Sequence, residues 1–160
     1  MLSKIFIANR GEVARRIAFT AKKMGLHTVC VVEKYPPKYL LGLVDEFFVV
    51  EEENVALFLD ADKMIDICLK TGCDSIHPGF GFLSESYIFA QKVKDAGLTF
   101  IGPSPEAIEK MASKERARDL AQKASVRISQ GFQVKNDMSL TQIATNCQEI
   151  GYPVLIKAAL

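Results

Sequence analysis

The chain has 160 residues, of which 49% are hydrophobic and 24% charged, a composition typical of a globular protein with one main core rather than a disordered chain. Its 20 Lys and Arg are balanced by 19 Asp and Glu and spread along the sequence, which argues against a nucleic-acid partner. The first apolar run is too short for a signal peptide or a membrane span, so we expect a cytoplasmic protein without a mitochondrial transit peptide.

The first hundred residues alternate between short apolar runs and segments of helical periodicity. The pattern predicts strands at 3–8, 27–33, 46–50, 73–78 and 98–103 and helices at 12–25, 60–72 and 86–97. Strands separated by helices need crossover connections, which predict a mostly parallel sheet covered on both faces. The fold class is therefore α/β and Rossmann-like, and the expected strand order is 3-2-1-4-5.

The first predicted helix carries an apolar stripe that identifies the face expected to pack on the sheet. This stripe consists of Val13, Ile17, Ala21 and Met24. Beyond the last predicted strand of the sheet, helical periodicity continues from 104 to 124, where Ser113 is a candidate cap dividing the segment.

The C-terminal segment predicts a further helix at 139–151 and then a strand at 152–160. A strand in this place would need partners from another part of a protein, because an unpaired strand leaves its backbone groups unsatisfied. We therefore interpret the last thirty residues as the opening of a second domain.

The cysteines give no sign of a disulfide framework or a zinc site. Cys30, Cys68, Cys73 and Cys147 form no C-x-x-C pair and lie mostly in apolar runs, which predicts reduced, packed thiols. No metal site is predicted.

The first strand-to-helix turn contains a single glycine, Gly11, where a dinucleotide-binding fold carries G-x-G-x-x-G. Glu33 ends the second strand, as a ribose-binding acid would, but the missing glycines make NAD binding a weak interpretation. Taken alone, Gly11 is better explained as a tight-turn residue.

Two loops should meet at the point where the strand order reverses. The loop Asn9, Arg10, Gly11 and Glu12 follows the first strand, and the loop 77–85 follows the fourth. Ligands of doubly wound sheets bind outside the carboxyl ends of these neighbouring strands.

Within loop 77–85, Gly79 and Gly81 would permit close backbone approach, Ser84 would cap the next helix, and Glu85 would lie in its first turn. The pattern alone leaves open whether these residues form a ligand loop or only a strand-to-helix turn.

Three other residues are candidates because of their context. We interpret His77 as a hydrogen-bonded structural histidine rather than a proton-transfer group. Lys114 lies at a helix junction, and Lys157 lies in an apolar run where a buried ammonium would need an anion such as a ligand phosphate. The alternatives are a solvated helix lysine and an edge-strand lysine.

Four segments together resemble a known family. "KIFIANRGEVARRI", "IHPGFGFLSES", "FIGPSPEAIEKMASK" and "GYPVLIKA" are similar, in order and spacing, to the N-terminal part of biotin carboxylases, the ATP-dependent component of acetyl-CoA, propionyl-CoA and pyruvate carboxylases. The resemblance implies a pre-ATP-grasp domain at 1–112, followed at 113–160 by a linker helix and the beginning of an ATP-grasp domain.

The family reaction uses ATP, Mg²⁺ or Mn²⁺, and bicarbonate to carboxylate biotin on a carrier protein, which then meets a carboxyltransferase. The resemblance implies that Lys114 and Lys157 contact ATP. It also implies a wall of the biotin and bicarbonate site made of His77, Gly79, Phe80, Gly81 and Glu85. Phe80 stands where the family usually has tyrosine, so a stacking face is kept and a hydroxyl is lost.

The resemblance also carries departures. The family's glycine-rich loop, metal-binding glutamates and catalytic base correspond to positions beyond Leu160, so we expect no catalytic residue in these 160 residues and no activity or tight cofactor binding by them alone. Phe19 and Lys23 replace an arginine and a glutamate that pair across a family homodimer, while Arg16 is retained. The sequence "LFLD" at 57–60 stands where the family has a Ser-Tyr-Leu-Asn segment. The alternatives are a non-catalytic partner-binding module and a regulatory Rossmann-like module.

Overall fold

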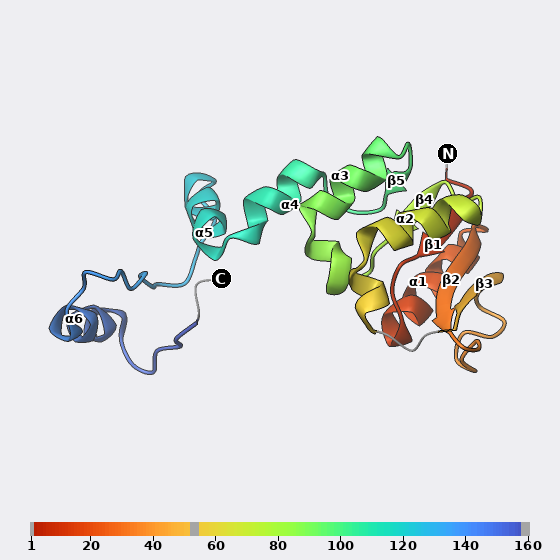
Figure 1. The fold of residues 1–160 in the computed structure, drawn as a ribbon. Coiled ribbons are helices and arrows are strands. Elements are labelled where there is room, and N and C mark those ends of the chain that lie inside the picture. The colour runs from red at the N-terminus through yellow and green to blue at the C-terminus, as the bar shows by residue number, and fades with distance from the viewer. Residues whose placement is uncertain (1, 52–54, 158–160) are drawn as a thin grey trace. The chain divides into compact units, whose positions relative to one another are not determined.

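A parallel sheet of five strands forms the centre of the N-terminal part of this computed structural model, which describes residues 2–51 and 55–157 (Figure 1). The strands are β1 (Lys4–Ile7), β2 (His27–Glu33), β3 (Glu46–Val50), β4 (Ser75–His77) and β5 (Thr99–Phe100). Their order is β3-β2-β1-β4-β5, and each neighbouring pair is parallel. The predicted fold class and strand order are confirmed.

Helices connect β1 to β2, β3 to β4 and β4 to β5, and a further helix follows β5. They are α1 (Gly11–Lys23), α2 (Ala61–Lys70), α3 (Tyr87–Asp95) and α4 (Pro105–Ala112), with the 3-10 helices η1 (Val55–Leu59) and η2 (Phe82–Glu85) before α2 and α3. Chain contacts divide the molecule into two units, Met1–Glu109 and Lys110–Leu160, and α4 crosses the division. The first unit holds the whole sheet.

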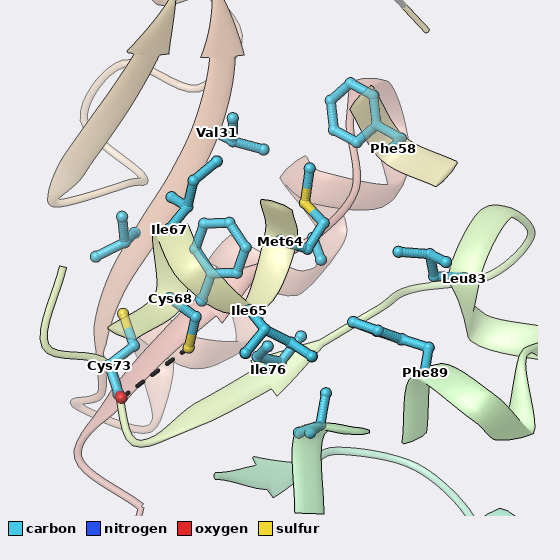
Figure 2. Packing of buried hydrophobic residues seen from close by; sticks show 14 of the residues in the cluster. Val31, Phe58, Met64, Ile65, Ile67, Cys68, Cys73, Ile76, Leu83 and Phe89 are labelled. Atoms are coloured by element: carbon cyan, nitrogen blue, oxygen red, sulfur yellow. Dashed lines mark hydrogen bonds between the residues drawn. The ribbon is translucent and has the colours of Figure 1, made fainter. Parts of the chain in front are cut away.

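Alternate side chains of the central strands enter two separate cores. Phe6 of β1 and Val31 of β2 pack in the larger core with residues of α2 and α3, whereas Ile7 and Cys30 pack in the smaller core with α1. Figure 2 shows part of the larger core, where Ile67 and Met64 of α2 lie among the strand residues. Both faces of the sheet are therefore covered, as parallel sheets require.

The face of α1 that packs on the sheet is made of small residues. Its buried residues are Ala14, Ala18 and Ala21. Met24, expected on this face, is 66% exposed, so that part of the predicted stripe is wrong. Alanine side chains let a helix lie close to a sheet, and the larger apolar residues beside them stay at the edge of the contact.

The cap of α3 also differs from the prediction. Ser84 lies inside η2, because a 3-10 turn occupies the residues before the helix. Ser86 caps α3 instead, with its hydroxyl accepting a hydrogen bond from the Phe89 amide at 3.2 Å. The predicted Ser84 cap is wrong by two residues.

The second unit contains α5 (Lys114–Lys123) and α6 (Leu140–Ile150). Ser113 caps α5, as predicted, and Ser139 and Gln142 form a capping box at the start of α6. Residues 152–157 form no strand, so that part of the predicted strand is wrong, and 158–160 lie outside the described residues. In 152–157 the backbone has no neighbouring strand to complete a ladder.

The thiols are free and mostly packed, which agrees with the prediction. Cys30, Cys68 and Cys73 are buried and Cys147 is half-buried. Across 2–51 and 55–157, none of the helices has the length and apolar character needed to cross a bilayer.

Replacing Phe89 tests how α3 is held on the sheet. Its ring is fully buried and meets the Phe100 ring edge-on, with centroids 5.9 Å apart. We expect Phe89→Ala to lower the free energy of unfolding by about 3–5 kcal/mol, because it leaves a cavity in the larger core. The neighbouring Ile88, which is 52% exposed, is the matched control: Ile88→Ala should cost less than about 1 kcal/mol. Urea unfolding of both variants measures the difference, and equal losses would contradict this packing.

Candidate functional site

The loops that follow β1 and β4 meet at the carboxyl end of the sheet, as the topology predicts. β1 and β4 are neighbours, and the Ala8 amide donates to the His77 carbonyl at 3.0 Å where the two strands end. Asn9 comes next on one chain segment and Pro78 on the other. The candidate site is built from these two segments.

The side chain of Asn9 joins the two loops. It is 1% exposed, and its Nδ2 donates to the Pro78 carbonyl at 2.7 Å and to the Phe80 carbonyl at 3.1 Å. Its Oδ1 accepts a hydrogen bond from the Arg10 amide at 2.9 Å. A buried amide with both ends satisfied fixes the position of each loop relative to the other.

Gly79 is required by this contact, and Gly81 is not. A Cβ at Gly79 would lie 2.5 Å from Val13 Cγ1 and 2.6 Å from Asn9 Nδ2, whereas a Cβ at Gly81 would meet nothing within 4 Å. Both glycines have positive φ, +71° and +66°. Gly79 therefore lets the backbone of this loop approach Asn9 and the first turn of α1 closely. Gly81 is favoured only because its φ is positive.

Arg10 gathers three further segments around the site. Its guanidinium lies 5.7 Å from the centroid of the Phe58 ring and 5.9 Å from that of Phe82, and its Nη1 is 4.0 Å from Glu33 Oε2. The two rings are themselves 5.6 Å apart. The Glu33 carboxylate, considered above as a ribose ligand, has this internal cation as its partner.

Phe58 and Phe82 are site residues that the sequence analysis missed. Phe82 adopts a φ of +47°, in the left-handed region that an aromatic residue rarely occupies. The signal that could have found the pair is the succession of aromatic residues between glycines in 79–82 and the isolated aromatic in 57–60. Cation–π contacts with Arg10 help to hold both rings at the site.

His77 is held by the loop backbone. Its Nδ1 accepts a hydrogen bond from the Gly79 amide at 3.1 Å, and burial lowers the pKa of the imidazole. An Nδ1 that accepts leaves the proton of the neutral ring on Nε2. The hydrogen-bonded structural role expected for His77 agrees with this geometry.

The side chains that this region presents to solvent are few. The Phe80 ring is 67% exposed, although its carbonyl is bound to Asn9. Glu85 of η2, Glu12 of α1 and the Arg10 side chain are exposed as well. The loop therefore offers an aromatic face on a backbone that is fixed from behind.

Lys114 and Lys157 both lie in the second unit. Lys114 is the first residue of α5, and Lys157 lies in coil after α6, with both side chains exposed. The prediction of a lysine inside a buried strand is thus wrong for Lys157, because no strand forms there. Exposed ammonium groups fit phosphate oxygens in their chemistry.

No metal site is formed by the residues the structure describes: 2–51 and 55–157 contain no group of three or more His, Cys, Asp or Glu side chains placed to hold an ion.

Comparisons with known proteins agree on one family. Residues 1–108 match the family described as biotin carboxylase, N-terminal domain. The chain is 39% identical over 163 residues to a biotin carboxylase of Halalkalibacterium halodurans, covering 99% of this chain and 35% of that protein. It is 38% identical over 161 residues to the mitochondrial methylcrotonoyl-CoA carboxylase subunit alpha of Dictyostelium discoideum, covering 99% and 23%.

A solved structure has the same arrangement. The dimer of the biotin carboxylase domain of Hydrogenobacter thermophilus 2-oxoglutarate carboxylase, in complex with MgADP, ADP and bicarbonate, superposes with a TM-score of 0.84 at 33% identity, covering 99% of this chain and 35% of that one. The chain therefore spans about a third or less of the length of these relatives.

Two glycine substitutions separate close approach from backbone conformation. Gly79→Ala should lower the free energy of unfolding by more than about 3 kcal/mol, because the new methyl meets Val13 and Asn9 in a strained backbone. Gly81→Ala should cost about 1–2 kcal/mol, since only the positive φ opposes it. Thermal and urea unfolding of the two variants measure the gap, and similar losses would show that the loops do not touch at Gly79.

The lowered pKa of His77 predicts a pH dependence of stability. Above its ordinary pKa of 6.5 the imidazole is neutral in both states, so it adds no slope. Below that value, the unfolded chain binds a proton before the folded chain does. The free energy of unfolding therefore decreases as the pH is lowered, by at most about 1.4 kcal/mol per pH unit, until the imidazole of the folded chain is protonated as well. In His77→Asn, urea unfolding between pH 8 and pH 5 should lack this component. A variant with the same slope as the wild type would refute the assignment.

Proposed function

Because the chain belongs to the biotin carboxylase N-terminal domain family, we propose that it forms the first part of a ligase that uses ATP and bicarbonate to carboxylate biotin on a carrier protein. The observation that carries this proposal is the fixed loop 77–81, which presents the Phe80 ring beside the carboxyl end of β4. We further propose that residues 1–112 act as the pre-ATP-grasp domain and that 113–160 begin the ATP-grasp domain.

Within this proposal, the loop residues have different roles. Phe80 supplies a flat apolar face for the biotin ring system, and Gly81 permits the turn that leads into η2. His77 and Gly79 hold the loop in place through their mutual hydrogen bond. Glu85, exposed at the end of η2, adds a carboxylate at the rim. These residues bind and orient, and the proton transfers belong to groups outside the 160 residues.

ATP cleavage needs charge neutralisation at the phosphates more than it needs covalent chemistry. We propose that Lys114 and Lys157 supply part of that positive charge. Mg²⁺ or Mn²⁺, when bound, would supply the rest of that positive charge, with ligands from other parts of the protein. The proposed partners are a biotin carboxyl carrier protein or domain and a carboxyltransferase.

A homodimer, if the protein forms one, would need a contact other than the Arg–Glu pair of the family. In α1, the Lys23 Nζ lies 4.4 Å from the centroid of the Phe19 ring, so these two side chains meet within one helix. A second copy of the chain would therefore contact the Lys23 ammonium packed on the Phe19 ring at this position.

The complete protein that contains this chain tests the proposal. It should cleave ATP in a reaction that depends on both bicarbonate and free biotin, and the 160-residue polypeptide alone should not. ATP turnover without dependence on biotin, or no turnover by the complete protein, would overturn the proposed activity and favour a partner-binding module.

Phe80 variants of the complete protein test the proposed stacking face. Phe80→Ala should raise the KM for free biotin about three- to tenfold, as expected for the loss of one stacking contact. Phe80→Tyr keeps the ring and should stay within about twofold of the wild type. The KM for ATP is the internal control, since neither variant should change it. An unchanged KM for biotin in Phe80→Ala would remove this residue from the site.

A further inference from the structure

Two cysteines occupy matched positions in the turn that ends α2. The Cys73 amide donates to the Cys68 carbonyl at 3.1 Å, and the Gly72 amide donates to the Leu69 carbonyl at 3.0 Å, with Gly72 at a φ of +67°. These paired bonds and the left-handed glycine define a Schellman motif at the helix C-terminus. Cys68 and Cys73 are the two residues whose side chains face each other across such a motif.

Cys68 and Cys73 meet in the interior of the protein. Cys68 is 0% and Cys73 5% exposed, and both belong to the larger core. The Cys68 thiol points to the Cys73 carbonyl, with Sγ and oxygen 4.0 Å apart (Figure 2). Helix ends of this type frequently pair two apolar side chains at these positions, whereas this chain has cysteines at both of them.

We propose that Cys68 and Cys73 are an oxidative modification site, at which a peroxide converts the two thiols to a reversible intramolecular disulfide. The Cys73 thiolate attacks one peroxide oxygen, forming a sulfenic acid and releasing hydroxide. The Cys68 sulfur then attacks the Cys73 sulfur, forming the disulfide and releasing water, while the hydroxide takes up the remaining proton. In total two thiols are oxidised and one hydrogen peroxide is reduced to two waters.

The two thiols differ in a way that suits these roles. The neighbouring Cys68 thiol and the Thr71 hydroxyl, 3.4 Å from Cys73 Sγ, lower the pKa of Cys73 to about 7, although burial opposes this shift. The same contact and burial raise the pKa of Cys68. Cys73 is therefore the attacking thiolate and Cys68 the resolving thiol. By contrast, burial raises the pKa of Cys30 to about 12, which makes Cys30 a matched unreactive control.

The position of the pair determines how an oxidant reaches it and what the bond would hold. The last turn of α2 borders solvent at Leu69 and Gly72, both exposed, so opening of this turn gives a small oxidant access. β4 starts two residues after Cys73 and leads to His77. The disulfide would thus tie the end of α2 to the strand that carries the loop 77–81. This inference does not depend on the proposed function.

Mass spectrometry of the reduced 160-residue chain after hydrogen peroxide treatment tests the proposal. Before alkylation, the oxidised chain should be about 2 Da lighter than the reduced chain, and dithiothreitol should restore the original mass. After alkylation of the remaining thiols and digestion, Cys68 and Cys73 should appear in one linked peptide. Cys68→Ala and Cys73→Ala should each abolish the linked peptide. Cys30→Ala and Cys147→Ala should retain it. Circular dichroism before oxidation identifies a variant that fails to fold.

The wild-type chain decides the outcome even if a variant does not fold. Oxidation that yields only sulfinic acid at Cys73, or only links between chains through Cys147, would overturn the proposal. So would a Cys68–Cys73 link that makes up no larger a share of the disulfides formed in the folded chain than in the chain unfolded by urea, because the cap geometry would then not select the pair.

Discussion

The buried amide of Asn9 is the interaction on which the candidate site depends. A polar side chain with 1% exposure must satisfy its donors and acceptor inside the protein, and here it does so with two carbonyls of one loop and one amide of the other. An unsatisfied buried amide would cost about 1–3 kcal/mol, so the loops can separate only at a substantial cost. The requirement for glycine at position 79 follows, because the bonded loop leaves no room for a side chain there.

The same junction positions the elements around it. Once Asn9 fixes the backbone of Arg10, the Arg10 guanidinium reaches Phe58 in η1, Phe82 in η2 and Glu33 at the end of β2. These segments lie far apart in the sequence, and none of them belongs to the loop 8–12. Arg10 thus converts a local contact between two loops into a common support for the carboxyl ends of β1, β2 and β4.

The sequence predicted what periodicity and topology determine, and it failed where local packing decides. Strand order followed from the alternation of strands and helices, and that order placed Asn9 beside Pro78. The helix cap was misplaced because Ser84 and Ser86 are equally good caps, and only the 3-10 turn selects between them. Met24 was misassigned because α1 ends at Lys23, which leaves Met24 as the C-cap residue beyond the face that packs on the sheet. Strand formation near Lys157 depends on a partner strand, which no local pattern supplies.

The hydrogen bonding of the loop after β4 limits what it can bind. In a phosphate-binding loop, backbone amides point outward to the ligand. Here the Gly79 amide is used by His77, and the carbonyls of Pro78 and Phe80 are used by Asn9, so these backbone groups face the protein. Among residues 77–81, Phe80 is the exposed one. Such a loop is suited to the face of a flat, uncharged ring system and poorly suited to a pyrophosphate, which distinguishes it from a dinucleotide site on the same type of sheet.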